Sequence, residues 1–218
     1  MSQNKKMLFL LCFFALHYIF HLKFTDFYSN SPLETPVTLG APQKITKEIF
    51  IPANQNYDLT FQFMKHGHNF EELDKIIGSS VYNKNYDLIP SGIAIPVHWS
   101  LYSKEANKLV ASGEKNTCCG SSYTREEIGR AIDKFSVPSG SYIFELEVLK
   151  PIPEFTNIHT NIKISYKPKD ESEWPSSYMW WGMLFNTLIA LPLSLYCIAK
   201  LFIYTFMRLT SRSRTRHK

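Results

Sequence analysis

The stretch SYIFELEVL, residues 141–149, alternates apolar and polar side chains with a period of two. On an extended chain Tyr142, Phe144, Leu146 and Val148 point to one side, and Glu145 and Glu147 point to the other. This pattern is typical of a half-buried strand in an antiparallel sheet, with one face on a core and the other in solvent.

Further short runs with β-like composition surround this stretch. They are ITKEIFIP (45–52), YDLTFQFM (57–64), IAIPVHWSLYS (93–103), NKLVAS (107–112), AIDKFSV (131–137) and NIHTNIKISYK (157–167). In the third run, Pro96 indicates an edge strand or a bulge, because proline cannot donate to a ladder. PSG, residues 138–140, predicts a hairpin turn between 131–137 and 141–149, with Gly140 at positive φ.

One helix is predicted among these strands, over HNFEELDKIIG (68–78). Asn69 is a good N-cap, and Glu72 stands three residues later in the capping-box position. The apolar stripe is Phe70, Leu73, Ile76 and Ile77, and Gly78 ends the helix. About seven strands and one short helix predict a mainly β fold with a single antiparallel β-sandwich domain.

An apolar run near the N-terminus, MLFLLCFFALHYIFHL (7–22), follows Lys5 and Lys6. As a helix, residues 7–24 would reach roughly 27 Å, about the thickness of a bilayer's hydrocarbon core. A removed secretory signal peptide has the same layout, but KFTDFY after the apolar run offers no small-residue cleavage site. The sequence therefore favours an uncleaved signal anchor.

A second apolar run lies near the C-terminus, where residues 181–199 contain no charge. Tyr178, Trp180 and Trp181 stand at its front edge, as aromatic residues do at a membrane interface. We predict a transmembrane helix over 180–207, which makes two transmembrane α-helices that flank the sandwich.

The charges of the chain are separated along it. All 19 acidic residues lie between Asp26 and Glu173, together with only 15 of the 24 basic ones. The candidate topology and lipid head-group residues at the ends are Lys5, Lys6, Lys200, Arg208, Arg212, Arg214 and Arg216. The positive-inside rule puts both ends in the cytoplasm. A nucleic-acid binder carries its positive charge on the folded domain, so we expect no nucleic-acid partner.

These observations predict the organisation of the chain. Residues 1–6 form a cytoplasmic N-terminus, 7–24 a first span, 25–43 an extended linker and 44–169 a periplasmic β-sandwich. Residues 170–179 form a second linker, 180–207 a second span and 208–218 a basic cytoplasmic tail. The expected location is the bacterial inner membrane, crossed twice.

The ordered set of motifs in residues 44–169 resembles the bacterial family known as domain of unknown function 5625. It consists of GIAIPVHWSLY (92–102) and the run from REEIG (125–129) through PSGSY (138–142) and IPEF (152–155) to the last strand. The resemblance implies a bacterial envelope β-sandwich with no assigned catalytic residues. Many relatives resemble lipoproteins or secreted proteins, and the second span departs from that pattern.

Cys118 and Cys119 are the only cysteines outside the two apolar runs. They are a candidate redox or disulfide pair, and free thiols or a bond between chains are the alternatives. A bridge between neighbours is constrained, because the usual Cα separation in a disulfide exceeds the 3.8 Å or so across one peptide. A zinc site with His66 and His68 lacks the usual ligand spacing, so no metal and no cofactor are expected.

Polar residues inside the apolar runs predict a contact between the two helices. His17 and His21 are four residues apart and share one helix face, and Asn186 and Thr187 lie within the second run. Polar groups are expensive in a bilayer, which favours a helix–helix seam at these four residues.

The sequence contains no nucleophile with a recognisable base. Two glutamate pairs, Glu126 with Glu127 and Glu145 with Glu147, are expected to be exposed to solvent and not to act as catalytic carboxylates. We therefore expect a non-enzymatic protein whose periplasmic sandwich binds another protein, in addition to membrane lipid. One form of this hypothesis is an immunity protein against an envelope-targeted toxin. A structural or accessory subunit of an envelope complex is the alternative, and a ligand-binding or enzymatic envelope protein is a third.

Overall fold

The computed structural model describes residues 3–65, 67–79, 81–82, 88–89, 91–166 and 174–215. The chain divides into two compact units. One contains Ser29–Glu171 and holds the strands, and the other combines Met1–Tyr28 with Ser172–Lys218 and is helical. Each unit is described separately below.

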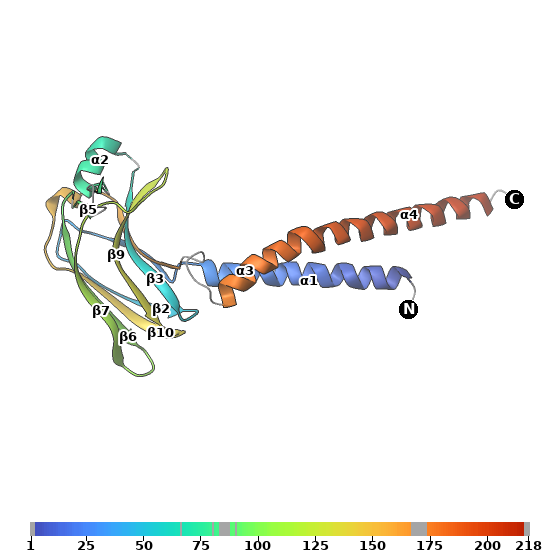
Figure 1. The fold of residues 1–218 in the computed structure, drawn as a ribbon, viewed down its shortest axis with the longest axis horizontal. Coiled ribbons are helices and arrows are strands. Elements are labelled where there is room, and N and C mark those ends of the chain that lie inside the picture. Colours follow the sequence, from blue (N-terminus) through green and yellow to red (C-terminus); the bar gives the residue numbers. More distant parts are fainter. Residues whose placement is uncertain are drawn as a thin grey trace. The chain divides into compact units, whose positions relative to one another are not determined.

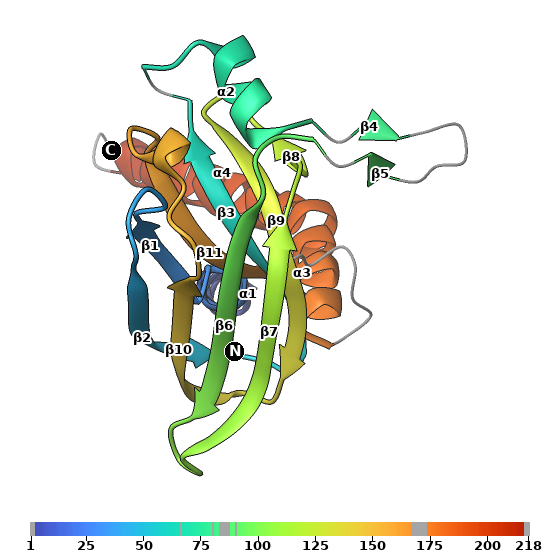
Figure 2. The ribbon, with the colours of Figure 1, turned by 90° about the vertical axis from the view of Figure 1, so that its left-hand side faces the viewer.

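The strand unit contains two main antiparallel sheets (Figure 2). The five-stranded sheet has the order β1 (Leu33–Val37), β11 (Thr160–Tyr166), β3 (Gln55–Met64), β9 (Glu127–Val137) and β8 (Ser122–Tyr123). The four-stranded sheet has the order β2 (Lys44–Ile51), β10 (Gly140–Val148), β6 (Ile95–Ser103) and β7 (Lys108–Thr117). The short strands β4 (Val81–Tyr82) and β5 (Leu88–Ile89) pair with each other.

The apolar core lies between the two sheets, because the alternating side chains of both sheets point into the same space. The four alternating residues Tyr142, Phe144, Leu146 and Val148 of β10 are all buried, as the alternation predicts, and Ile143 on the other face is partly exposed. Trp99 on β6 connects the layers: its ring lies 5.3 Å from that of Phe135 on β9, and its Nε1 donates to Asp133 Oδ2 at 3.2 Å. A bulge opposite Leu59 and Thr60 shifts the alternation of β9 between Arg130 and Asp133.

The predicted linker over residues 25–43 is wrong in its middle. Residues 33–37 form β1, which pairs with β11, and Leu33 and Val37 are buried. The stretch 25–43 has three prolines and no periodic pattern, which predicted a linker, but an edge strand tolerates Pro36 because one side of it needs no ladder donor.

The predicted hairpin around PSG is also wrong. β9 belongs to the five-stranded sheet and β10 to the four-stranded one, so residues 138–139 carry the chain from one sheet to the other. Tyr142 fixes this crossing by donating its hydroxyl to the Pro138 carbonyl at 2.7 Å. Gly140 does not have a positive φ. Local sequence shows where a strand ends, but the choice of the next partner is a long-range property.

The strand that contains Pro96 lies inside its sheet and not at the edge. β6 pairs with β10 on one side and with β7 on the other. Pro96 is the second residue of β6, and the ladder with β10 ends one residue later, at Val97 and Val148. The missing N–H therefore costs no ladder bond to β10. The bulge of this strand pair lies in β7, at Val110, opposite Leu101 and Tyr102 of β6.

The helix α2 (Phe70–Ile77) forms as predicted from its caps. Asn69 Oδ1 accepts a hydrogen bond from the Glu71 N–H at 3.0 Å, and Gly78 follows the helix at φ 85°. Leu73 and Ile77 are buried, whereas Phe70 is half exposed. The apolar stripe is therefore narrower than predicted at its first turn.

The helical unit consists of α1 (Gln3–Ser29) and a second helix made of α3 (Trp174–Phe185), a π-helical turn η3 (Asn186–Ala190) and α4 (Leu191–Thr215). The two run side by side in opposite directions, so the start of α1 and the end of α4 lie at the same end (Figure 1). The second helix begins at Trp174, inside the predicted linker 170–179. Within the described residues, Asn4–Ser29 and Trp174–Met207 are long and apolar enough to cross a membrane.

Candidate functional site

The polar residues inside the apolar helices meet in pairs. His17 Nδ1 lies 3.0 Å from Asn186 Oδ1, and His21 Nε2 lies 3.0 Å from the Met179 carbonyl oxygen. Both partners are acceptors, so these two ring nitrogens carry the proton and donate. His21 and Asn186 are buried. The structure thus brings three of the four predicted seam residues into hydrogen-bonding contact between the helices.

Gly182 allows the close approach of the helices at His21. A Cβ at this position would lie 2.2 Å from His21 Cδ2 and 2.6 Å from Nε2. Small residues are typical of interfaces between membrane helices, because they let two backbones come near each other. The hydrogen bond from His21 to the Met179 carbonyl therefore depends on the absence of a side chain at Gly182, about one turn after Met179.

Aromatic rings fill the rest of the seam. The His17 ring meets the Phe185 ring edge-on, with centroids 4.8 Å apart, and the Phe14 ring lies 6.3 Å from the Phe185 ring. Tyr178 packs against His21 and Phe24, with ring centroids 5.7 and 4.6 Å away. Edge-to-face ring pairs contribute about 0.5–1.5 kcal/mol beyond the burial of their area.

A π-helical turn aims Asn186 at α1. The Leu191 N–H donates to the Asn186 carbonyl, five residues back, in place of the usual four. Pro192 follows directly and explains the wider turn, because its ring clashes with the carbonyl four residues earlier and has no N–H to offer it. Such turns occur frequently at functional sites.

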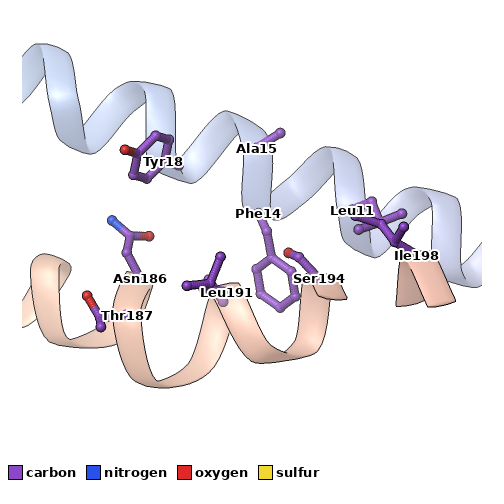
Figure 3. A pocket seen from close by; sticks show the side chains of 10 residues that line it. Leu11, Phe14, Ala15, Tyr18, Asn186, Thr187, Leu191, Ser194 and Ile198 are labelled. Carbon is purple, nitrogen blue, oxygen red and sulfur yellow. The ribbon is translucent and has the colours of Figure 1, made fainter. Parts of the chain in front are cut away.

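The seam opens into a cavity of about 620 Å³. It is lined by Leu11, Phe14, Ala15, Tyr18, Asn186, Thr187, Ala190, Leu191, Ser194 and Ile198. Figure 3 shows Tyr18 on α1 and Asn186 on the second helix, facing each other across it. Thr187, the fourth predicted seam residue, is exposed and lines the same cavity.

Asn186 has an unused donor at the wall of this cavity. Its Oδ1 accepts from His17, but its Nδ2 is buried and has no hydrogen-bond partner among the described residues. A buried amide N–H without an acceptor costs about 1–3 kcal/mol. The arrangement can accept a group from outside that presents an oxygen to Nδ2.

The basic residues of the two ends gather at one end of the helix pair. Lys5 and Lys6 are exposed in the first turns of α1. Lys200 is exposed on α4, with Nζ 5.2 Å from the centre of the Tyr196 ring. Arg208, Arg212 and Arg214 lie on the last turns of α4, and Arg216 lies outside the described residues.

The cysteine pair lies in the strand unit, after β7, with the two sulfurs 2.8 Å apart and unbonded. Near it lies Arg130, a residue that the sequence reading missed. Arg130 is fully buried and donates to the carbonyls of Ile93, Ile76 and Ile77. A signal for it exists in the sequence, because Arg130 occupies an inward position between Ile128 and Ile132 in the alternation of β9.

Nothing in the described part of the chain resembles a metal centre, since no three His, Cys, Asp or Glu side chains gather there. His66, one of the two histidines considered with the cysteines, lies outside the described residues. A polar hollow of about 510 Å³ lies on the five-stranded sheet. Charged side chains of this hollow have partners within it. Glu127 Oε1 accepts a hydrogen bond from the Gln62 amide at 2.7 Å, and Lys134 Nζ lies 3.6 Å from Asp58 Oδ1.

Fold and site together define an antiparallel two-sheet unit joined to a pair of long apolar helices. Residues 35–166 match the model of a family, and the chain belongs to that family, described as Domain of unknown function (DUF5625). This confirms the resemblance seen in the sequence.

Comparison with solved structures shows the fold. A crystal structure of a protein from Sulfurospirillum deleyianum is similar with a TM-score of 0.51 at 21% identity, and the match covers 63% of this chain and 98% of that one. The structure of infectious bursal disease virus Gx strain matches with a TM-score of 0.15 at 9% identity, over 63% of this chain and 38% of that chain. This second likeness is too low to carry an argument. No curated protein matches the chain.

Proposed function

We propose that the protein is a non-enzymatic, membrane-anchored binding protein. Its two helices cross the bacterial inner membrane with both termini in the cytoplasm, and the strand unit is a β-sandwich held in the periplasm. The length and composition of the helices support the anchoring. The clustering of the basic ends at one end of the helix pair supports the orientation, because cytoplasmic flanks are rich in Lys and Arg.

The unused donor of Asn186 carries this proposal. Within a bilayer no water is present to satisfy Nδ2, and a lipid acyl chain has no acceptor to offer. The cavity beside it is open and has Thr187 and Ser194 on its wall. A transmembrane helix of a partner protein, with a side-chain or backbone oxygen that faces the cavity, would fill the space and accept from Asn186. The protein then acts as an accessory subunit of an envelope complex.

A second candidate contact lies on the sandwich. β2 is an edge of the four-stranded sheet, and among the described residues it pairs on one side only, with β10. An open edge can add an extended strand of another protein. Charged side chains restrict which strands can be added to this edge, since Lys44 forms a salt bridge with Glu145 and Glu48 forms one with Lys104. In this form the protein blocks its partner, as an immunity protein does with a toxin, and deleting the gene would sensitise cells to neighbouring kin.

We expect Asn186→Leu to release the partner. A hydrogen bond between membrane helices contributes about 0.6–2 kcal/mol, so the recovered partner should fall by about 3- to 30-fold. The measurement is quantitative mass spectrometry of proteins that co-purify with the tagged full-length chain in mild detergent.

Two matched variants make this result specific. Thr205→Val removes a polar group of the same helix whose hydroxyl donates to Leu201, outside the cavity. His17→Phe removes the intramolecular bond to Asn186 but leaves Nδ2 in place. Both variants should retain the partner. Equal recovery from Asn186→Leu and the controls would overturn the intramembrane contact.

A further inference from the structure

We propose that Cys118 and Cys119 form a reversibly oxidised dithiol that exchanges with an external disulfide, and that Arg130 is the fixed positive charge beside the attacking thiolate. This inference does not depend on the proposed partner contact in the membrane. It rests on the placement of the two sulfurs, on the groups that hold them and on the surroundings of Arg130.

The pair is held in place from three directions. The Gly120 N–H donates to the Gly78 carbonyl at 2.7 Å, and the Tyr123 hydroxyl donates to the same oxygen at 3.2 Å. The Ser91 N–H points at Cys119 Sγ, 3.2 Å away. Cys119 has φ 61°, an uncommon conformation for a residue with a Cβ. These hydrogen bonds fix the loop to the C-terminal end of α2 and keep the two sulfurs next to each other.

The two thiols differ in access. Cys119 is 2% exposed, whereas Cys118 is only partly buried. A reagent in solution therefore reaches Cys118 first. Cys119 can reach one electrophile in particular, its neighbour's sulfur, which lies 2.8 Å away.

Arg130 lacks an acidic partner. Among the described residues, no carboxylate lies within ion-pair distance of its guanidinium, and its buried Nε has no hydrogen-bond partner there. Burial lowers the pKa of Arg130 to about 10, while negative charge on Cys118, Cys119 or Tyr123 acts to raise it. A buried cation of this kind favours a thiolate nearby.

The surroundings shift the pKa values of the two cysteines in opposite directions, down for Cys119 and up for Cys118. Burial opposes ionisation of Cys119, but hydrogen bonds from the Cys118 thiol and from Ser91, with the charge of Arg130, leave its pKa lowered. The hydrogen bond to Cys119, followed by burial, raises the pKa of Cys118. Cys119 is accordingly the more acidic thiol of the pair, and Cys118 is the thiol that faces outward.

The exchange proceeds in two balanced steps. The Cys118 thiol loses its proton to solvent, and its sulfur attacks an external disulfide, forming a mixed disulfide and expelling one thiolate. Cys119 then loses its proton to solvent and, as the thiolate, attacks Cys118 Sγ, forms the Cys118–Cys119 bond and expels the second thiolate. The pair loses two electrons, and the external disulfide gains them. A bond between adjacent cysteines is constrained and hence readily reduced again, which makes the step reversible.

The test uses the full-length chain with Cys12→Ser and Cys197→Ala, which leaves only this pair. The reduced protein is incubated in glutathione buffers of rising oxidation, then quenched with acid, denatured and labelled with a maleimide for mass spectrometry. We expect both thiols to disappear together, with no glutathione retained and no dimer on a non-reducing gel. Stable glutathione adducts, unreacted thiols or a disulfide-linked dimer would refute the proposal.

Single variants separate the two roles. Cys119→Ser should stop at a glutathione adduct on Cys118, because the second step is missing. Cys118→Ser should react at least tenfold more slowly, because Cys119 is buried. If both variants react at the same rate and give the same adduct, the assigned order is wrong.

The role of Arg130 is tested by the pH profile of the second step. Arg130→Gln should move this profile to higher pH, and Arg130→Lys, which keeps the charge, should move it less. An unchanged profile in a folded Arg130→Gln protein would remove Arg130 from the proposal. If Arg130→Gln does not fold, the stepwise behaviour of the two cysteine variants still decides whether the pair is a dithiol site.

Discussion

Arg130→Ala will lower the free energy of unfolding of the strand unit by about 3–5 kcal/mol, the range of the largest core truncations. The side chain is fully buried and donates to carbonyls at the end of α2 and at Ile93. Its removal leaves these oxygens without a donor, at about 1–3 kcal/mol each, and opens a cavity beside Phe63 and Phe155. The relief of a buried charge offsets part of this loss.

The measurement is urea unfolding of the full-length protein in mild detergent. Trp174, Trp180 and Trp181 are replaced by Phe, so that Trp99 alone reports on the strand unit. The matched control is Arg125→Ala, which removes an exposed arginine five residues earlier. We expect the control to change stability by less than about 0.5 kcal/mol. A loss of equal size in both variants would show that Arg130 does not hold α2 on the sheet.

Gly182→Leu will separate the helices at His21. The added Cβ alone would lie 2.2 Å from His21 Cδ2, so the ring must leave its place. Overpacking costs about 1–3 kcal/mol. The lost hydrogen bond to Met179, at roughly 0.6 kcal/mol, and weaker contacts of Tyr178 bring the expected cost to about 2–4 kcal/mol.

This cost is measured by titration of the detergent-solubilised chain with sodium dodecyl sulfate, followed by the fluorescence of the three tryptophans at the start of the second helix. Met183→Leu changes the next residue, which is exposed, and should leave the midpoint where it was. If Gly182→Leu leaves the midpoint unchanged too, the helices do not depend on close approach at this point.

Sequence reasoning reached the elements that depend on local chemistry. The alternation in 141–149 predicted the burial of its four inward-facing residues, and Asn69 and Gly78 predicted both ends of α2. The four-residue spacing of His17 and His21 predicted a shared face. In each case the signal lies within one or two turns of chain, where backbone geometry fixes the direction of a side chain.

The rest depends on partners that are distant in the sequence. β9 and β10 follow each other directly in the sequence, but β9 pairs with β3, whereas β10 pairs with β2 and β6. The packing of the two sheets determines these partners. The stretch around Pro36 was predicted as a linker because nothing in its local sequence shows that β11 lies beside it. Arg130 can be buried only because segments 37 and 53 residues away bring their carbonyls to it. No local pattern contains that information.

The most direct test of the intramembrane contact is site-specific photo-crosslinking in living cells. A photoreactive residue in place of Leu191, which lines the cavity and is 56% exposed, is compared with one at Leu193, which is exposed on the opposite face of α4. The proposal predicts one protein adduct from position 191, little from 193, and loss of the adduct when Asn186→Leu is added. Adducts to lipid alone, or the same proteins from both positions, would contradict it.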